Sequence, residues 1–173
     1  MEAYQPATPT ALNSGKKARG ELVSCFKLTI DDTMNSIAEN IGYCLELSRL
    51  GGGVGTLLTD LRPLGDPIKG ILNRASGVMP VAKLLENSFS YSNQLGQRNG
   101  SGVAYLNIFH GDIEEFISSK KPNADEKIRL ATLSTGVIIP DIFFTLMQKD
   151  KDIVLFSPYD IYKEYGKRMS EIS

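Results

Sequence analysis

Short apolar runs alternate along the chain with longer segments in which apolar residues recur every three or four positions. Short apolar runs are typical of strands, and the wider spacing is typical of helices with one buried side. The short runs predict strands at 22–30, 53–58, 103–109, 136–140 and 153–156. The longer segments predict helices at 33–49, 80–94, 112–119, 141–148 and 158–166. This alternation indicates an α/β fold with mostly parallel strands and right-handed crossovers.

The two longest predicted helices have the clearest boundaries. Asp32 or Thr33 can cap the first helix through a side-chain oxygen, and Gly51 can end it. Pro80 suits the first turn of the second helix, which we expect to run to about Gln94. Each helix has an apolar stripe that must be buried, either against the sheet of this chain or against a second subunit. The stripe residues are Met34, Ile37, Ile41, Cys44 and Leu45 in the first helix, and Val81, Leu84, Leu85 and Phe89 in the second.

The connections are rich in glycine, proline and charge. Residues 1–17 contain turn-forming sequences such as Thr8-Pro9-Thr10, and we expect a frayed terminus there. A loop is expected at 59–69, and a charged surface connection at 120–127. Between them, a flexible glycine loop is expected at 95–102, with Arg98 in its middle.

The composition restricts the classes of function. A chain of 173 residues with 42% hydrophobic and 23% charged residues fits one globular domain. Its net charge of −1 predicts no broad surface for nucleic acid or for an anionic membrane. We recognise no signal peptide and no apolar run of membrane-spanning length. We therefore expect a cytoplasmic protein whose two cysteines do not form a disulfide framework.

Few residues mark chemistry by themselves. Cys25 lies on a predicted buried strand, where a cysteine is typically an inert small hydrophobe, and the same interpretation applies to Cys44 on its helix stripe. His110 is the only histidine and has no cysteine beside it, so a metal site has no support. The spacing does not exclude a Ser-His-Asp triad, although no nucleophile elbow marks one.

Glycines and basic residues in loops favour a phosphorylated ligand. The cluster 51–55 closes a helix and opens a strand, whereas a dinucleotide-binding fingerprint does the reverse. Gly15-Lys16-Lys17 lacks the earlier glycine and the following Ser or Thr of a phosphate loop. Arg62, Lys69 and Arg98 lie in loops beside glycine or proline, where they can bind an anion. Asp32 adds a carboxylate at a helix start.

Five segments, in chain order, resemble one enzyme family. They are Arg19-Gly20-Glu21-Leu22-Val23-Ser24-Cys25-Phe26, Gly51-Gly52-Gly53-Val54, Leu84-Leu85-Glu86-Asn87-Ser88-Phe89-Ser90-Tyr91, Asn123-Ala124-Asp125-Glu126-Lys127-Ile128-Arg129 and Leu155-Phe156-Ser157-Pro158-Tyr159-Asp160. The resemblance covers nearly the whole chain and is to the catalytic large (alpha) subunit of class I ribonucleotide reductases, closest to class Ib. It implies a ribonucleoside-diphosphate reductase, which makes deoxyribonucleotides from ribonucleoside diphosphates by thiyl-radical chemistry. The implied fold is part of the first half of a ten-stranded α/β barrel.

The resemblance implies roles on the substrate side. Cys25 matches the first cysteine of the redox pair that reduces the ribose 2′ carbon, and Ser24 adjoins the substrate. Thr8 matches a substrate-phosphate contact, and Gly53 packs against the nucleotide. Residues 1–20 would then be a substrate-phosphate segment, and 21–173 a partial barrel domain that contains the effector site.

It also implies allosteric roles. Asp32 matches the carboxylate that binds the ribose of a deoxynucleoside triphosphate effector, and Arg62 matches a contact to its phosphates. Lys69 falls where the family often has a basic residue. The loop from Gln94 to Gly102 matches the one that relays effector identity to the substrate, with Gln94 and Arg98 in the relaying positions. The helices near 33–49 and 80–94 match those of the subunit dimer.

The implied partners lie on other chains. A metal-containing small subunit supplies the radical, a glutaredoxin- or thioredoxin-like thiol reductant restores the cysteines, and this chain itself holds no cofactor. The family's large subunit is several times longer, and the radical cysteine, the second redox cysteine and the radical-pathway tyrosines have no counterpart here. The resemblance therefore implies a fragment that is inactive alone. The alternatives are a non-catalytic remnant that binds effector or pairs with a full-length subunit, and a product that cannot fold by itself.

Overall fold

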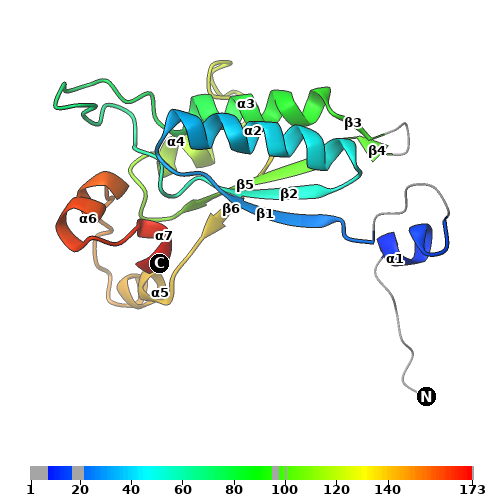
Figure 1. The fold of residues 1–173 in the computed structure, drawn as a ribbon. Coiled ribbons are helices and arrows are strands. Elements are labelled where there is room, and N and C mark those ends of the chain that lie inside the picture. Colours follow the sequence, from blue (N-terminus) through cyan, green and yellow to red (C-terminus); the bar gives the residue numbers. More distant parts are fainter. Residues whose placement is uncertain (1–7, 17–21, 95–97, 100, 173) are drawn as a thin grey trace.

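The computed structural model describes residues 8–16, 22–94, 98–99 and 101–172. Within them, parallel strands form one sheet in the order β1-β2-β5-β6 (Figure 1). Cys25 lies beside Gly53, and Gly53 lies beside Ser101. The predicted parallel α/β architecture is therefore confirmed. The strands are β1 Cys25–Thr29, β2 Gly53–Leu57, β5 Ser101–Asn107 and β6 Ser134–Ile138.

Two long helices cover one face of this sheet (Figure 1). Helix α2 Met34–Arg49 begins after Thr33, whose hydroxyl accepts a hydrogen bond from the Ser36 amide at 3.1 Å. The helix is closed by Gly51, whose φ of 93° lies in the left-handed region that favours glycine. Helix α3 Val78–Tyr91 lies beside α2. The shorter helices are α4 Ile113–Ser118, α5 Asp141–Gln148, α6 Pro158–Tyr165 and α7 Met169–Ile172.

The core lies between these long helices and the sheet. Alternate strand residues such as Val54, Ala104 and Leu106 point toward α2 and α3 and are buried with Leu85 and Phe89. The residues between them point to the opposite side of the sheet, because side chains alternate along a strand. We call the two sides the helix-covered face (Val54, Thr56, Gly102, Ala104 and Leu106) and the bare face (Cys25, Lys27, Gly53, Gly55, Val103 and Tyr105).

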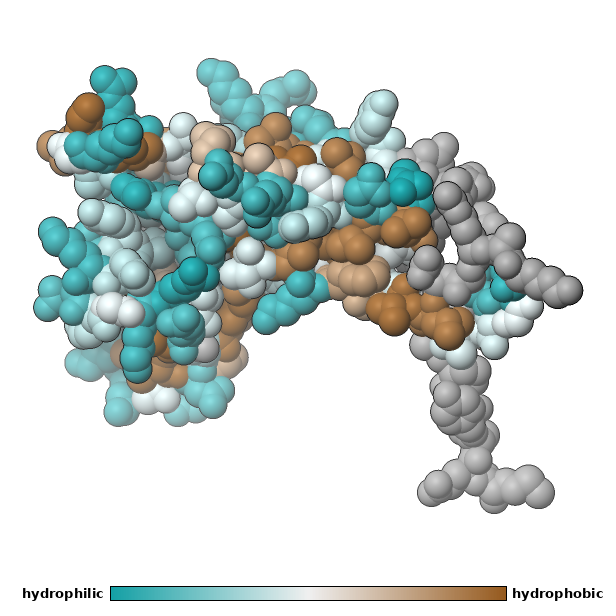
Figure 2. All heavy atoms as spheres, in the orientation of Figure 1, coloured by the Kyte–Doolittle hydropathy of each residue, from teal (hydrophilic) through white to brown (hydrophobic). Residues whose placement is uncertain are grey.

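Apolar residues remain visible at the β1 edge of the sheet. Figure 2 shows them below α2, and the segment that leads into β1 contributes Leu22 and Val23, which are 53% and 62% exposed. β1 and β6 are the two outer strands of the sheet, so each has one edge without a strand partner among the described residues. This open arrangement fits a part of a barrel rather than a closed one.

Several element boundaries differ from the predictions. α3 ends at Tyr91 rather than near Gln94, because Ser92 is extended and the next residues pair with a short strand. These two strands, β3 Asn93–Gln94 and β4 Arg98–Asn99, form an antiparallel pair where a flexible loop was predicted. No strand forms at 153–156, since only Phe156 pairs, through a single bridge to His110.

The ends of the chain also differ. The segment predicted to fray contains a short helix, α1 Thr8–Asn13, in which Pro9 occupies the first turn, a position that proline tolerates. Helix α7 near the C-terminus was not predicted. α5, α6 and α7 lie near the carboxyl ends of the strands, whereas α1 lies beyond their amino ends (Figure 1). In the described part of the chain, no helix has both the length and the apolar character required to cross a membrane.

Candidate functional site

The first candidate site lies at the amino end of β1. The Ser24 hydroxyl is 3.8 Å from the Cys25 sulfur, and the amide of Gly53 donates to the Ser24 carbonyl at 2.6 Å. The pairing of β1 with β2 places Cys25 directly beside Gly53. The structure thus brings together three of the residues predicted on the substrate side.

Cys25 is exposed, which corrects the prediction of a buried thiol. An apolar run predicts a strand but does not say which of its two sides is covered, and Cys25 is on the bare face. It lines an open hollow of about 660 Å³ together with backbone and side chains of β2 and β5. Gly53 and Gly55 have no side chains that would fill this hollow. The Tyr105 ring lies across the face, 3.5 Å from the position that a Cβ on Gly55 would take. A thiol beside such a hollow can reach a bound molecule.

Cys44 is on the other side of the sheet. It is fully buried in α2, and this burial raises the pKa of its thiol to about 12. A thiol with so high a pKa stays protonated and unreactive at neutral pH. Cys44 is therefore a core residue, as its position on the helix stripe indicated.

The second candidate site lies at the carboxyl end of β1. The Arg62 Nε donates to a carboxylate oxygen of Asp32, and the Arg62 Nη1 donates to the Pro67 carbonyl at 2.5 Å. The guanidinium carbon is 4.4 Å from the centre of the Tyr159 ring, a cation–π distance. The structure therefore brings together Asp32 and Arg62, two residues that the sequence predicted for an effector.

The remaining predicted residues are less closely joined. Lys69 is exposed at the tip of a turn closed by the Ile68–Ile71 pair, with a φ of 50°. Gln94 and Arg98 are paired across β3 and β4, whereas Leu95, Gly96, Gln97 and Gly100 of the same predicted loop lie outside the described residues. Thr8 begins α1. Roughly 20 Å of extended chain separates Cys25 from Asp32, so the two candidate sites are at opposite ends of the sheet.

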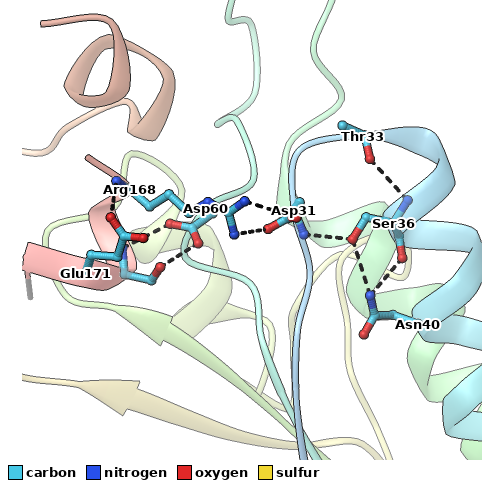
Figure 3. Close-up of polar contacts among 8 residues, drawn as sticks. Asp31, Thr33, Ser36, Asn40, Asp60, Arg168 and Glu171 are labelled. Carbon is cyan, nitrogen blue, oxygen red and sulfur yellow. Dashed lines mark hydrogen bonds and ion pairs between the residues drawn. The ribbon is translucent and has the colours of Figure 1, made fainter. Parts of the chain in front are cut away.

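A third group of residues was not predicted. Arg168, just before α7, binds the Asp31 carboxylate with both terminal nitrogens, at 2.5 and 3.3 Å (Figure 3). The Asp60 carboxylate accepts hydrogen bonds from the amide and the hydroxyl of Ser170. Figure 3 shows Asp31 between Arg168 on one side and Ser36 of α2 on the other. More than a hundred residues separate these partners in the chain, and no local sequence signal could have paired them.

His110 has a structural role. Its Nε2 donates to the Leu61 carbonyl at 2.7 Å, and its Nδ1 accepts from the Asp112 amide at 3.0 Å. Burial lowers the pKa of this imidazole, and the Leu61 carbonyl and the Asp112 carboxylate oppose that effect without reversing it. Since both ring nitrogens are bound to backbone groups, His110 has no free nitrogen with which to activate a serine. The triad that the spacing left open is therefore excluded.

The family model for the barrel domain of ribonucleotide reductase matches residues 23–172. The chain belongs to the ribonucleotide reductase family. The resemblance seen in the sequence is thus confirmed, and the parallel sheet fits a part of that barrel.

Curated relatives agree with this assignment. The chain is 56% identical over 170 residues to the ribonucleoside-diphosphate reductase subunit alpha of Mycoplasma pneumoniae, and 53% identical over 171 residues to that of Bacillus subtilis. The alpha subunit of Chlamydia pneumoniae is 36% identical over 172 residues. Each match covers 98–99% of this chain but only 24%, 24% and 16% of the relative, respectively. The chain therefore spans about a quarter or less of the length of these reductase subunits.

Proposed function

We propose that this chain is a portion of a ribonucleoside-diphosphate reductase alpha subunit and contributes two of its sites. The exposed thiol of Cys25, on the bare face and beside Ser24 and Gly53, is the observation that carries this proposal. In the proposed role, Cys25 and a second cysteine outside this chain supply two electrons and two protons to a ribonucleoside diphosphate. The ribose 2′ C–O bond breaks, the hydroxyl leaves as water, and the two thiols become a disulfide. The buried Cys44 is not that second cysteine.

The remaining substrate-side roles follow from the same position. Gly53 lets the nucleotide approach the backbone, because no Cβ extends into the hollow. Ser24 adjoins the substrate through its hydroxyl. Thr8, which belongs to the segment 1–20, binds a phosphate of the substrate. The partial barrel, 21–173, then carries both the redox cysteine and the effector site.

The effector site is proposed at the other end of β1. Asp32 binds the ribose of a deoxynucleoside triphosphate, Arg62 and Lys69 bind its phosphates, and Gln94 and Arg98 relay its identity toward the substrate. In the structure Asp32 and Arg62 bind each other. A nucleotide that uses both residues must therefore open this ion pair. Hydrogen bonds from the guanidinium to the phosphates offset the interaction lost with Asp32.

We propose a dimer through the outer sides of α2 and α3. Met34 and Tyr43 of α2 are 78% and 55% exposed, and Tyr91 of α3 is 85% exposed, although all three are large apolar or aromatic residues. Met34 and Leu84 were both predicted to be on buried stripes, and the exposure of each corrects that prediction. A second copy of these helices would cover such residues, which the first copy leaves in solvent.

The whole reductase is proposed to act with two further proteins. A metal-containing small subunit supplies the radical, and a glutaredoxin- or thioredoxin-like protein reduces the disulfide, in a cytoplasmic pathway that provides deoxyribonucleotides for DNA replication. This chain by itself is expected to show no reductase turnover.

Calorimetric titration of the 173-residue chain with dTTP tests the effector site. We expect saturable binding that Asp32→Ala abolishes, because the ribose contact and the partner of Arg62 are both removed. Glu126→Ala is the control, since Glu126 is an exposed carboxylate outside both the site and the proposed dimer helices. A folded chain that binds no dTTP would contradict this part of the proposal.

A second candidate is a nucleotide-binding chain without catalysis. The observation that favours it is the complete Asp32–Arg62 pair, formed within this chain alone. Reductase turnover after the chain is mixed with the remaining portion of an alpha subunit and a small subunit would support the catalytic proposal. Retained dTTP binding without any turnover in that mixture would favour the second candidate.

A further inference from the structure

The C-terminal segment 157–171 contacts the candidate effector site at two points. Its Tyr159 covers the Arg62 guanidinium at 4.4 Å, and its Arg168 binds Asp31, the residue next to Asp32. Two further bonds join the same segment to the loop that contains Arg62. The Ser157 hydroxyl donates to the Asp66 carboxylate, and Ser170 donates to Asp60.

We infer that Tyr159 and Arg168 are positioning residues of the proposed nucleotide site, so that the segment 157–171 contributes to effector affinity. This inference rests on the proposed function of Asp32 and Arg62. The sequence resemblance assigned no role to either residue. Tyr159 acts through Arg62 and Arg168 acts through Asp31, and neither contacts the nucleotide itself.

Tyr159 positions the Arg62 side chain after the ion pair opens. Arg62 is bound by Asp32, by the Pro67 carbonyl and by the Tyr159 ring, which come from three different segments. A nucleotide that takes Asp32 leaves the other two contacts in place. The Tyr159 ring then still packs against one face of the Arg62 guanidinium. The edge of the guanidinium formed by Nε and Nη2 can donate hydrogen bonds to an incoming phosphate.

Arg168 reduces the negative charge beside the proposed nucleotide site. Asp31 and Asp32 are adjacent carboxylates at the start of α2, and a bare pair would repel a triphosphate. Arg168 neutralises Asp31 through both terminal nitrogens, and the Asp31 amide is held separately by the Ser36 hydroxyl at 2.9 Å. The Asp31 side chain can therefore be altered without loss of the backbone contact that precedes α2 (Figure 3).

The test measures dTTP binding to variants of the full 173-residue chain by calorimetry. We expect Tyr159→Leu to weaken binding about fivefold, because it removes the ring face, and Tyr159→Phe to stay within about twofold of the unaltered chain. Tyr162→Leu is the matched control, an exposed tyrosine on the same helix. In the absence of nucleotide, NMR should show faster solvent exchange of the Arg62 Nε–H in Tyr159→Leu than in Tyr162→Leu.

The role of Arg168 has its own test. Arg168→Gln should weaken dTTP about threefold but dTMP less, because the uncovered Asp31 repels three phosphates more than one. The double variant Asp31→Asn with Arg168→Gln should restore dTTP binding, which a merely structural role of the ion pair would not allow. Lys167→Gln is the neighbouring control.

The outcomes separate the two proposals. Absence of dTTP binding by the unaltered chain overturns the proposed effector site and this inference with it. Binding by the unaltered chain with equal affinity in Tyr159→Leu and Tyr162→Leu overturns the role of Tyr159 alone. Failure of the double variant to restore binding overturns the electrostatic role of Arg168.

Discussion

On one face of the sheet, Val54, Ala104 and Leu106 are buried below α2 and α3, whereas on the other face their neighbours Gly53, Gly55 and Tyr105 line an open hollow. The same strands build both faces, because successive side chains point to opposite sides. The helix-covered face has large apolar residues in close contact. The bare face has glycines, a tyrosine and an exposed thiol. The difference indicates that the first face holds the fold together, whereas the second face leaves Cys25 accessible in the described part of the chain.

Neighbouring residues of β5 provide the strongest contrast. Leu106→Ala should destabilise the chain by about 2–5 kcal/mol, because the Leu106 side chain is fully buried and its removal opens a cavity in the core. Tyr105→Ala, one residue earlier and 40% exposed, should cost about 1 kcal/mol or less. Urea unfolding of the two variants gives the comparison. Equal losses would contradict the assignment of the two faces.

Glycines on the two faces should respond differently to an added methyl group. A Cβ on Gly102 would lie 2.0 Å from the ring of the buried Phe89, whereas a Cβ on Gly55 would be 3.5 Å from the exposed Tyr105. We expect Gly102→Ala to cost about 1–3 kcal/mol and Gly55→Ala to change stability by less than about 0.5 kcal/mol. Thermal unfolding of both variants measures this difference, and a more severe loss in Gly55→Ala would reverse the interpretation.

The helix-covered side should also respond to acid through Glu86. Burial opposes ionisation of this carboxylate, but hydrogen bonds from the Thr132 and Leu133 amides and from Lys83 outweigh it and lower the pKa to about 2. Because the folded pKa is below the ordinary 4.5, the stabilisation is present above that pH and is lost as the pH falls toward 2. Glu86→Gln should cost about 1–2 kcal/mol at pH 7 and progressively less below pH 4.5.

Denaturant unfolding at pH 7 and at pH 3 measures this dependence. Glu39→Gln, which removes an exposed carboxylate of α2, is the matched control. An equal loss of unfolding free energy in Glu86→Gln at both pH values would show that packing rather than charge explains its effect.

The regular elements could be predicted from the sequence because their patterns are local. The bounds predicted for α5 agree with the structure, and Thr33 and Gly51 delimit α2 as expected. The exposure of Cys25 could not be predicted, since an apolar run does not reveal which side the helices cover. The segment 153–156 has strand composition, yet it lies beside the end of β5, where a single bridge is all that forms.

The candidate sites were predictable to different degrees. Asp32 and Arg62 were chosen separately, by motif, and the structure shows that they bind each other. Their contacts with Tyr159 and Arg168 depend on how distant segments fold together, so no spacing in the sequence could reveal them.

The reactivity of the two cysteines tests the contrast between the faces most directly. The folded chain is treated with iodoacetamide, and the modified thiols are identified by mass spectrometry over time. Cys25, exposed on the bare face, should be alkylated while the chain is folded. Cys44, buried and with its pKa raised to about 12, should react only after the chain is unfolded. Modification of Cys44 at the same rate as Cys25 in the folded chain would contradict the account.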